Sequence, residues 1–289
     1  MGRNVDRRAG RMNLHRLTII LLLLMVVGSL GAQQQYHLRD GTILNADDVV
    51  VRGVELVETV DSDSVGAVVE RTYPLSEAVR LDWPEPEAFE LAREALATGR
   101  GAEVSALLEP VRAEFVLFAK VPGSWWTAAS LLRLRSLLES GASTAAEAAA
   151  RELIATAIDP EAVGLARLGL AELEVAAGHG DIAAAMVNAI LAEEVPAGVH
   201  ARSWLVRGEL ALQRGDAEAA LEAFLRIPVL YGNRRELLAS ALDGSRRAYL
   251  LARDTGRADR AAAELQRDFP LSPEAARLGT VGSISLPSS

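Results

Sequence analysis

The side chains that most often perform chemistry in proteins are few in this chain and stand far apart. The 289 residues include no cysteine and four histidines, His15, His37, His179 and His200. None of the histidines has a neighbour at the spacing that places two ligands on one metal ion. The lack of cysteine excludes disulfides, thiol catalysis and thiolate metal sites. We therefore expect no metal site.

Sequence motifs of catalysis and of nucleotide binding are also missing. There is no Gly-x-Ser-x-Gly nucleophile motif, no phosphate-binding loop and no dinucleotide fingerprint. The Gly178-His179-Gly180 sequence is explained by a turn between helices. The acidic residues are scattered over what we expect to be helical surface. The sequence thus predicts a protein that is not an enzyme, with no catalytic residue and no cofactor.

The aromatic pair Trp125-Trp126 is the most visible candidate for a ligand contact. Neighbours on a helix point about 100° apart, so at most one of the two can be fully buried. The other could line a binding groove or take part in packing between domains. This pair is the basis for one hypothesis, that the protein is an enzyme or a carbohydrate-binding protein with its site around the two tryptophans. We consider it beside the two interaction hypotheses given below.

Composition and charge limit the classes of fold and partner. Half of the residues are apolar but only 4% are aromatic, which favours an aliphatic, alanine-rich core of closely packed helices. The chain has 30 basic and 39 acidic residues, a net charge of −9. Such a surface repels phosphate backbones, so we expect no nucleic-acid partner.

Residues 1–32 have the pattern of a signal peptide. Several arginines precede an apolar stretch from Leu17 to Leu30, which is short for a membrane span. Cleavage after Ala32 or after Gly31 would release an exported, periplasmic protein. An uncleaved segment would instead anchor the chain to the inner membrane, which is the one membrane contact that we expect. Gln33 stands where a lipidated cysteine would be needed.

Residues 33–84 predict a small β domain of four or five strands, either a curled sheet or an SH3-like barrel. Short valine-rich and leucine-rich runs alternate with turn signals. Asp40-Gly41 is a strong hairpin dipeptide, Arg52-Gly53 is a weaker turn and residues 61–64 form a polar loop. Two prolines, Pro84 and Pro86, close the region because proline disfavours both strand and helix there.

Residues 87–278 predict a ladder of helical hairpins, followed by a disordered tail over 279–289. Glycines lie between helical stretches at intervals of 42, 39, 35 and 41 residues, a period typical of stacked helical repeats. Each glycine should adopt the left-handed conformation that ends the first helix. Asp181 and Asp216 should cap second helices. The glycines are Gly99, Gly141, Gly180, Gly215 and Gly256, and the residues five positions later are Val104, Ala146, Ala185, Ala220 and Ala261.

The stretch 201–224 resembles the tetratricopeptide repeat (TPR). Trp204, Gly208, Ala220 and Phe224 have the mutual spacing of that family's W, G, A and F positions. The unit around Gly256 keeps Ala261 and Leu265 but has Tyr249 at the small-residue position. The unit around Gly180 is a weaker match, and those around Gly99 and Gly141 are recognisable mainly by their spacing. The resemblance implies an α-solenoid of about five hairpins, with repeat packing through Trp204, Gly208, Gly215, Ala220, Phe224, Gly256 and Ala261.

In that family the first helices of successive repeats line a concave groove. The resemblance therefore implies a protein or peptide partner in this groove. The candidate groove residues are Arg202, Leu205, Glu209, Leu212 and Gln213, together with Trp125 and Trp126.

The order of the segments is similar to that of exported bacterial TPR proteins. The closing repeats, with Ile227-Pro228 and Phe269-Pro270, are similar to those of the Tol-Pal accessory repeat proteins, which carry an N-terminal coiled coil where this chain has a β region. We expect a non-enzymatic protein–protein interaction scaffold of the bacterial cell envelope. The alternative is a structural or self-assembly module whose β domain makes the contacts while the repeats act as a spacer.

Overall fold

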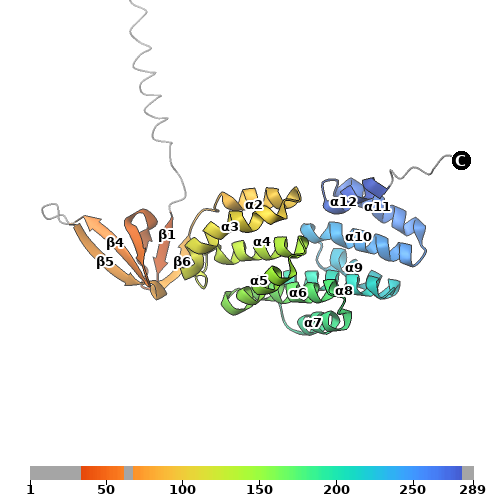
Figure 1. The fold of residues 1–289 in the computed structure, drawn as a ribbon, viewed down its shortest axis with the longest axis horizontal. Coiled ribbons are helices and arrows are strands. Elements are labelled where there is room, and N and C mark those ends of the chain that lie inside the picture. Colours follow the sequence, from red (N-terminus) through yellow and green to blue (C-terminus); the bar gives the residue numbers. More distant parts are fainter. Residues whose placement is uncertain (1–33, 62–67, 282–289) are drawn as a thin grey trace, which may run out of the picture. The chain divides into compact units, whose positions relative to one another are not determined.

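The computed structural model describes residues 34–61 and 68–281 and divides the chain into two compact units. The described part of the first unit covers residues 34–85 and Val121–Ser124, and the second covers 86–120 and 125–281 (Figure 1). The expected signal peptide lies outside the described residues. Within the described ranges, no helix is long and apolar enough to cross a membrane.

The first unit contains two antiparallel sheets of three strands each. The sequence predicted four or five strands, whereas the described residues form six. These strands divide between two sheets and do not form one curled sheet. In one sheet the order is β2 (Ile43–Asn45), β1 (Gln35–Leu38), β6 (Ala78–Asp82). In the other it is β3 (Val49–Arg52), β4 (Glu55–Asp61), β5 (Val68–Pro74).

Two of the predicted turns are confirmed. Gly41 and Gly53 have positive φ angles of 90° and 64° between paired strands. The Asp40 carboxylate accepts a hydrogen bond of 2.9 Å from the Thr42 N–H, which fixes the first turn. Residues 62–64 of the predicted polar loop lie outside the described residues.

The segment Val121–Ser124 belongs to the β unit although it lies between two helices in sequence. The N–H of Leu81 donates a 2.8 Å hydrogen bond to the carbonyl oxygen of Pro122. A Cβ on Gly123 would lie 2.0 Å from the Leu81 carbonyl oxygen, so only glycine fits this approach. The boundary predicted at Pro84 and Pro86 therefore separates the strands from the helices correctly. The prediction did not include residues 121–124, which return to the β unit.

The second unit consists of five helical hairpins and a closing helix (Figure 1). Successive helices pack in pairs. We call the helix that comes earlier in each pair the first helix and the one that follows it the second helix. First helices are α2 (Ala88–Ala97), α4 (Trp125–Glu139), α6 (Pro160–Ala176), α8 (Ala197–Gln213) and α10 (Arg235–Leu251). Second helices are α3 (Gly101–Phe115), α5 (Ser143–Thr156), α7 (Gly180–Ala192), α9 (Ala217–Leu230) and α11 (Thr255–Asp268). The closing helix α12 (Pro273–Val281) runs three residues past the predicted end of the repeats.

All five hairpins turn through the same backbone structure. One residue with positive φ follows each first helix, and the second helix begins two residues later. The N–H after that residue donates to a carbonyl five positions back, as in Asp216 to Ala211 and Asp254 to Tyr249, which is a Schellman cap. The turn residues are Gly99, Gly141, Gly178, Gly215 and Arg253, at intervals of 42, 37, 37 and 38 residues.

Two of the predicted turn glycines are therefore wrong. Gly180 and Gly256 lie inside α7 and α11, while Gly178 and Arg253 hold the left-handed position. The error arose because a glycine in a sequence indicates only that a turn is permitted, and Arg253 adopts a conformation that arginine rarely takes. The corrected intervals are more regular than the predicted ones.

The same shift of register corrects two further predictions. Ala183, not the exposed Ala185, is the buried small residue of the third hairpin. Asp216 caps α9 by accepting a 3.0 Å hydrogen bond from the Ala219 N–H, as predicted. Asp181 caps nothing, because it lies within α7 and its exposed side chain pairs with Arg214 at 2.8 Å.

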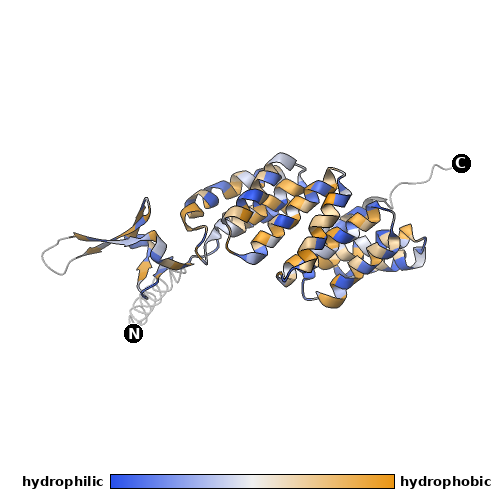
Figure 2. Cartoon of the chain, turned by 90° about the horizontal axis from the view of Figure 1, so that it is seen from below, coloured by the Kyte–Doolittle hydropathy of each residue, from blue (hydrophilic) through white to orange (hydrophobic). Residues whose placement is uncertain are grey.

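Each second helix buries the same two positions. Orange and blue residues alternate along the helices in Figure 2, as expected for helices that bury one side. The positions five and twelve residues after the turn are at most 5% exposed in all five hairpins. They are Val104, Ala146, Ala183, Ala220 and Ala258, and Val111, Leu153, Ile190, Ile227 and Leu265.

Phe224 fills the space between the fourth and fifth hairpins. A Cβ on Gly208 of α8 would lie 2.6 Å from its ring, and a Cβ on Gly244 of α10 would lie 2.4 Å from it. The two glycines thus allow helices to approach both sides of one buried ring. The predicted packing role of Gly208 and Phe224 agrees with this geometry, and Ala261, at 8% exposed, is also buried.

Candidate protein-binding face

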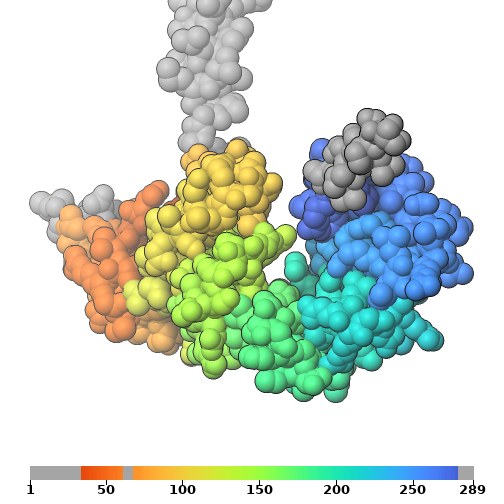
Figure 3. All heavy atoms as spheres, turned by 45° about the vertical axis from the view of Figure 1, so that its right-hand side comes forward, coloured from red at the N-terminus to blue at the C-terminus, as the bar shows by residue number. Residues whose placement is uncertain are grey.

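The first helices lie side by side along the second unit. Each of α4, α6 and α8 packs on the next first helix as well as on its own partner. Consecutive second helices make at most marginal contacts in the described part of the unit. The first helices are therefore the more closely packed set, and we call the surface that they form the inner face. Figure 3 shows the hollow between the α2–α3 end, in yellow, and the α10–α12 end, in blue.

One position of the repeat carries a charge in every first helix. It lies six residues before the turn residue, and in α8 it is Glu209, a predicted groove residue. Counted from the predicted turn glycines, the same position is Leu250 in the fifth hairpin, so the charge in every first helix becomes visible only with Arg253 as the fifth turn residue. The five residues are Arg93, Arg135, Glu172, Glu209 and Arg247.

The other predicted groove residues of α8 differ in their surroundings. Leu205 and Leu212 are half-buried and pack against apolar clusters between hairpins, so they support the helix stack. Gln213 is exposed at the end of the helix. Arg202 is partly buried on the inner side, beside charged residues of three neighbouring first helices.

The two adjacent tryptophans separate into a core residue and a partly exposed one. Trp126 is 1% exposed, so it belongs to the core and is not accessible to a ligand. Trp125 is half-buried and its ring lies 5.2 Å from that of Phe89. The expectation that at most one can be fully buried is confirmed, and Trp126 no longer counts as a groove candidate.

Trp204 packs against the apolar cluster around Ile227, as the resemblance implied, and it also contacts charged neighbours. Its ring is half-buried between two arginines, with the guanidinium carbon of Arg226 4.2 Å and that of Arg207 4.9 Å from the ring centroid. Arg207 lies on α8 like Trp204, whereas Arg226 comes from α9, so the contact with Arg226 joins the two helices of the fourth hairpin.

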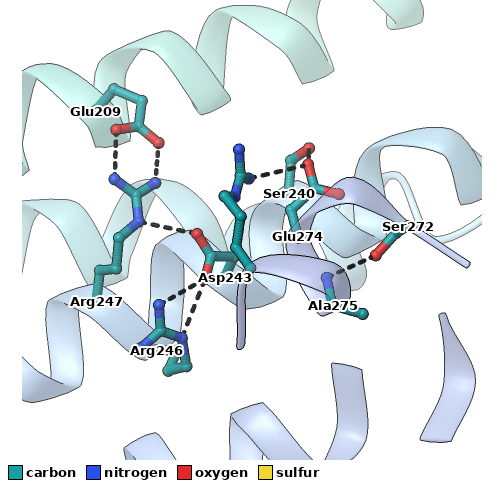
Figure 4. Close-up of polar contacts among 9 residues, drawn as sticks. Glu209, Ser240, Asp243, Arg246, Arg247, Ser272, Glu274 and Ala275 are labelled. Atoms are coloured by element: carbon teal, nitrogen blue, oxygen red, sulfur yellow. Dashed lines mark hydrogen bonds and ion pairs between the residues drawn. The ribbon is translucent and has the colours of Figure 1, made fainter. Parts of the chain in front are cut away.

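Glu209 is engaged in a network between the fourth and fifth hairpins (Figure 4). The two guanidinium Nη atoms of Arg247 donate to its two carboxylate oxygens. The Arg247 Nε donates to Asp243 at 3.0 Å, and Arg246 donates to the other oxygen of that carboxylate. Burial lowers the pKa of Arg247, but the hydrogen bonds and charges of Glu209 and Asp243 raise it overall. Glu209 therefore joins α8 to α10.

The closing helix α12 is joined to the fifth hairpin by a hydrogen bond and by apolar contacts (Figure 4). The Ser240 hydroxyl of α10 donates to Glu274 at 2.8 Å, and the start of α12 itself is held by the Ser272 hydroxyl, which accepts from the Ala275 N–H at 3.1 Å. Ala275 and Leu278 pack on Leu265 of α11. The helix thus covers apolar surface that the last hairpin would otherwise expose.

Glu172 of α6 and Arg202 of α8 are the partly buried charges of the inner face that have no such bonds. Among the described residues, neither side chain makes a hydrogen bond or an ion pair with another. Burial raises the pKa of Glu172, against the opposing effect of Arg202. Burial also lowers the pKa of Arg202, and Arg135 lowers it further while three glutamates oppose the shift. Both shifts disfavour the charged forms.

A buried arginine elsewhere in the unit shows the contrast. Arg112 of α3 is 7% exposed and donates to Ser130, Glu109 and Glu152 at distances of 2.7–3.0 Å. Its hydrogen-bonding capacity is used to hold three helices together. Arg202 has no comparable partners in the described structure.

The three histidines within the described ranges do not assemble into a site. His37 lies on β1, His179 contacts Glu174 at 2.8 Å in the third turn, and His200 contacts the Glu193 carbonyl on the next hairpin. In the described ranges, no cluster of three or more acidic or histidine side chains could hold a metal ion. Comparison of the chain with protein-family models, curated proteins and solved structures finds no match.

Proposed function

We propose that this protein is an exported, non-enzymatic scaffold of the bacterial cell envelope. It binds a protein segment along the inner face of a TPR-like α-solenoid. The observation that supports this proposal is the row of first helices, each with a charged residue at one equivalent position. Stacked helical repeats with such a continuous inner face bind extended segments or helices. The export proposal rests on the arginine-rich and apolar residues of the first 32 positions.

The test is affinity purification with a charge exchange on the inner face. Glu172→Arg combined with Arg202→Glu keeps the net charge but inverts the polarity of the face. Glu209 is not suitable for this purpose, because it accepts hydrogen bonds from Arg247, which also donates to Asp243, and a change there would break this network. The matched control is Glu147→Arg with Arg151→Glu, which exchanges an exposed ion pair on the second helix α5.

We expect the inner exchange to remove specific partners from envelope extracts and the outer exchange to retain them. Circular dichroism must show equal helix content in both variants. Identical partner lists for the two variants, or no partner for the unaltered chain, would contradict the proposal.

The second candidate is that the β unit, as an SH3-like module, makes the contacts and the repeats act as a spacer. It is favoured by exposed valines on the strands and turns of that unit, Val50 at 55%, Val54 at 75% and Val68 at 62%. Sedimentation velocity of the full chain, with Val50→Thr and Val68→Thr as variants, tests this candidate. A self-associated species that the two variants dissociate would support it, and a monomer at all concentrations would oppose self-assembly.

A further inference from the structure

The strongest unexplained feature of the inner face is the pair Glu172 and Arg202. They lie on the adjacent first helices α6 and α8, and both are partly buried. Three of the charged residues around them already have a partner. Arg135 donates to Glu139 at 2.7 Å, and Glu209 is held by Arg247. Within the described ranges, the pair itself has no hydrogen bond to any side chain.

The charges around this pair leave an acidic excess. The residues whose charges act on Arg202 are Arg135, Glu139, Glu172 and Glu236, from α4, α6 and α10. Arg135 and Glu139 neutralise each other, which leaves Arg202 with two glutamates. The chain as a whole is also acidic, with a net charge of −9. A phosphate or an acidic peptide would meet repulsion here, whereas a basic group would be attracted.

Such a pair lowers the stability of the free protein. A charge that is removed from water loses hydration, and this loss is offset only when hydrogen bonds or a close counter-ion replace it. Glu172 has neither in the described structure. Groups of this kind gain their missing interactions when a ligand supplies them, and sites of function often retain them at a cost in stability.

We infer that Glu172 receives an arginine or lysine side chain of the protein segment bound along the first helices, and that Arg202 donates to a carbonyl oxygen of the same segment. The inference rests on the proposed function and adds the chemistry of the partner. An arginine can give two parallel N–H···O bonds to one carboxylate, so it suits Glu172 best. The half-buried position strengthens this pairing, because water competes less for the carboxylate.

The test uses the full chain and a displayed library of random 12-residue peptides. Selected peptides are synthesised with a fluorophore, and their dissociation constants are measured by fluorescence anisotropy. Each basic residue is then replaced in turn, arginine by citrulline, which has the same shape without the charge. The protein variants are Glu172→Gln and, as a control on the second helix α9, Glu218→Gln, whose side chain is exposed.

We expect the selected peptides to share a basic residue. Glu172→Gln and the citrulline replacement should each weaken binding by about tenfold or more. Together they should weaken it little further, since both remove the same contact. Glu218→Gln should leave the affinity unchanged. A melting temperature of Glu172→Gln at or above that of the unaltered chain excludes misfolding as the cause.

Two other outcomes distinguish the inference from the proposed function. Peptides that bind the first helices without a basic residue, or that bind Glu172→Gln unchanged, would overturn the inference and leave the scaffold function in place. The absence of any selected peptide whose binding depends on a first-helix residue would overturn both.

Discussion

Arg253 occupies in the fifth hairpin the backbone position that Gly215 occupies in the fourth. Their φ angles are 61° and 73°, and the N–H of each donates to the carbonyl three residues back. Arginine in this left-handed conformation places its Cβ close to the following carbonyl, which glycine avoids. The chain therefore retains the turn at a local cost.

Arg253→Gly should stabilise the protein. The exposed Arg253 side chain makes no hydrogen bond or ion pair within the described residues, and relief of the strained conformation is worth about 1 kcal/mol. Urea unfolding followed by circular dichroism measures the change. The reciprocal variant Gly215→Ala should destabilise by a similar amount, and equal stability of the two variants would show that the turn conformations differ from those described.

Gly208→Ala should destabilise by about 1–3 kcal/mol, because a Cβ would overlap the Phe224 ring at 2.6 Å. Gly180→Ala is the matched control. Its added Cβ would have Leu210 Cδ2 as nearest neighbour at 3.9 Å, and alanine favours the helix by up to about 1 kcal/mol. Thermal unfolding should thus shift in opposite directions for the two changes. A stabilised Gly208→Ala protein would contradict the packing of α8 on α9.

Asp216→Ala should cost about 1 kcal/mol, since it removes the side-chain cap on the Ala219 N–H. Asp181→Ala should change stability by less than about 0.5 kcal/mol, because its carboxylate makes only an exposed ion pair with Arg214. The unfolding free energies in urea compare the two variants directly. Equal losses would restore the original expectation that both aspartates cap helices.

Glu172→Gln should stabilise the free protein at neutral pH by about 1 kcal/mol. Burial raises the pKa of Glu172 in the folded state, so the folded protein binds this proton more tightly than the unfolded chain does. The charged carboxylate therefore lowers stability above the raised pKa, and the penalty disappears as the pH falls below the ordinary value of 4.5. The gain from Gln should follow the same course in unfolding experiments between pH 4 and pH 8. A gain that grows toward acid pH would have the wrong sign.

The turn and the helix packing of the fourth hairpin, which best matches the TPR pattern, could be predicted from the sequence. Gly215 lies at a turn, and Gly208 and Phe224 are recognisable because close helix packing demands a glycine opposite a large ring. The turns of the third and fifth hairpins were predicted at Gly180 and Gly256, which lie two and three residues after the turn residues Gly178 and Arg253. No local pattern indicates that Arg253 takes a left-handed conformation.

The candidate site was predictable only in part. Glu209 followed from the repeat spacing, but its bond to Arg247 crosses 38 positions and depends on which helices are neighbours. Glu172 was missed because its importance lies in partial burial without a partner, which a sequence does not display. Once Gly178 is taken as the turn, the alignment of Glu172 with Glu209 gives the missing signal.

The central claim, that the inner face of the first helices binds a protein segment, is tested most directly by site-specific photo-cross-linking in the producing cells. A photoreactive amino acid is placed at the exposed positions Arg135 of α4 and Glu236 of α10, and at Ile182 of α7 and Leu225 of α9, which are 53% and 41% exposed. We predict a discrete cross-linked protein from Arg135 and Glu236, and none from Ile182 and Leu225. Cross-links from the second helices alone would contradict the claim.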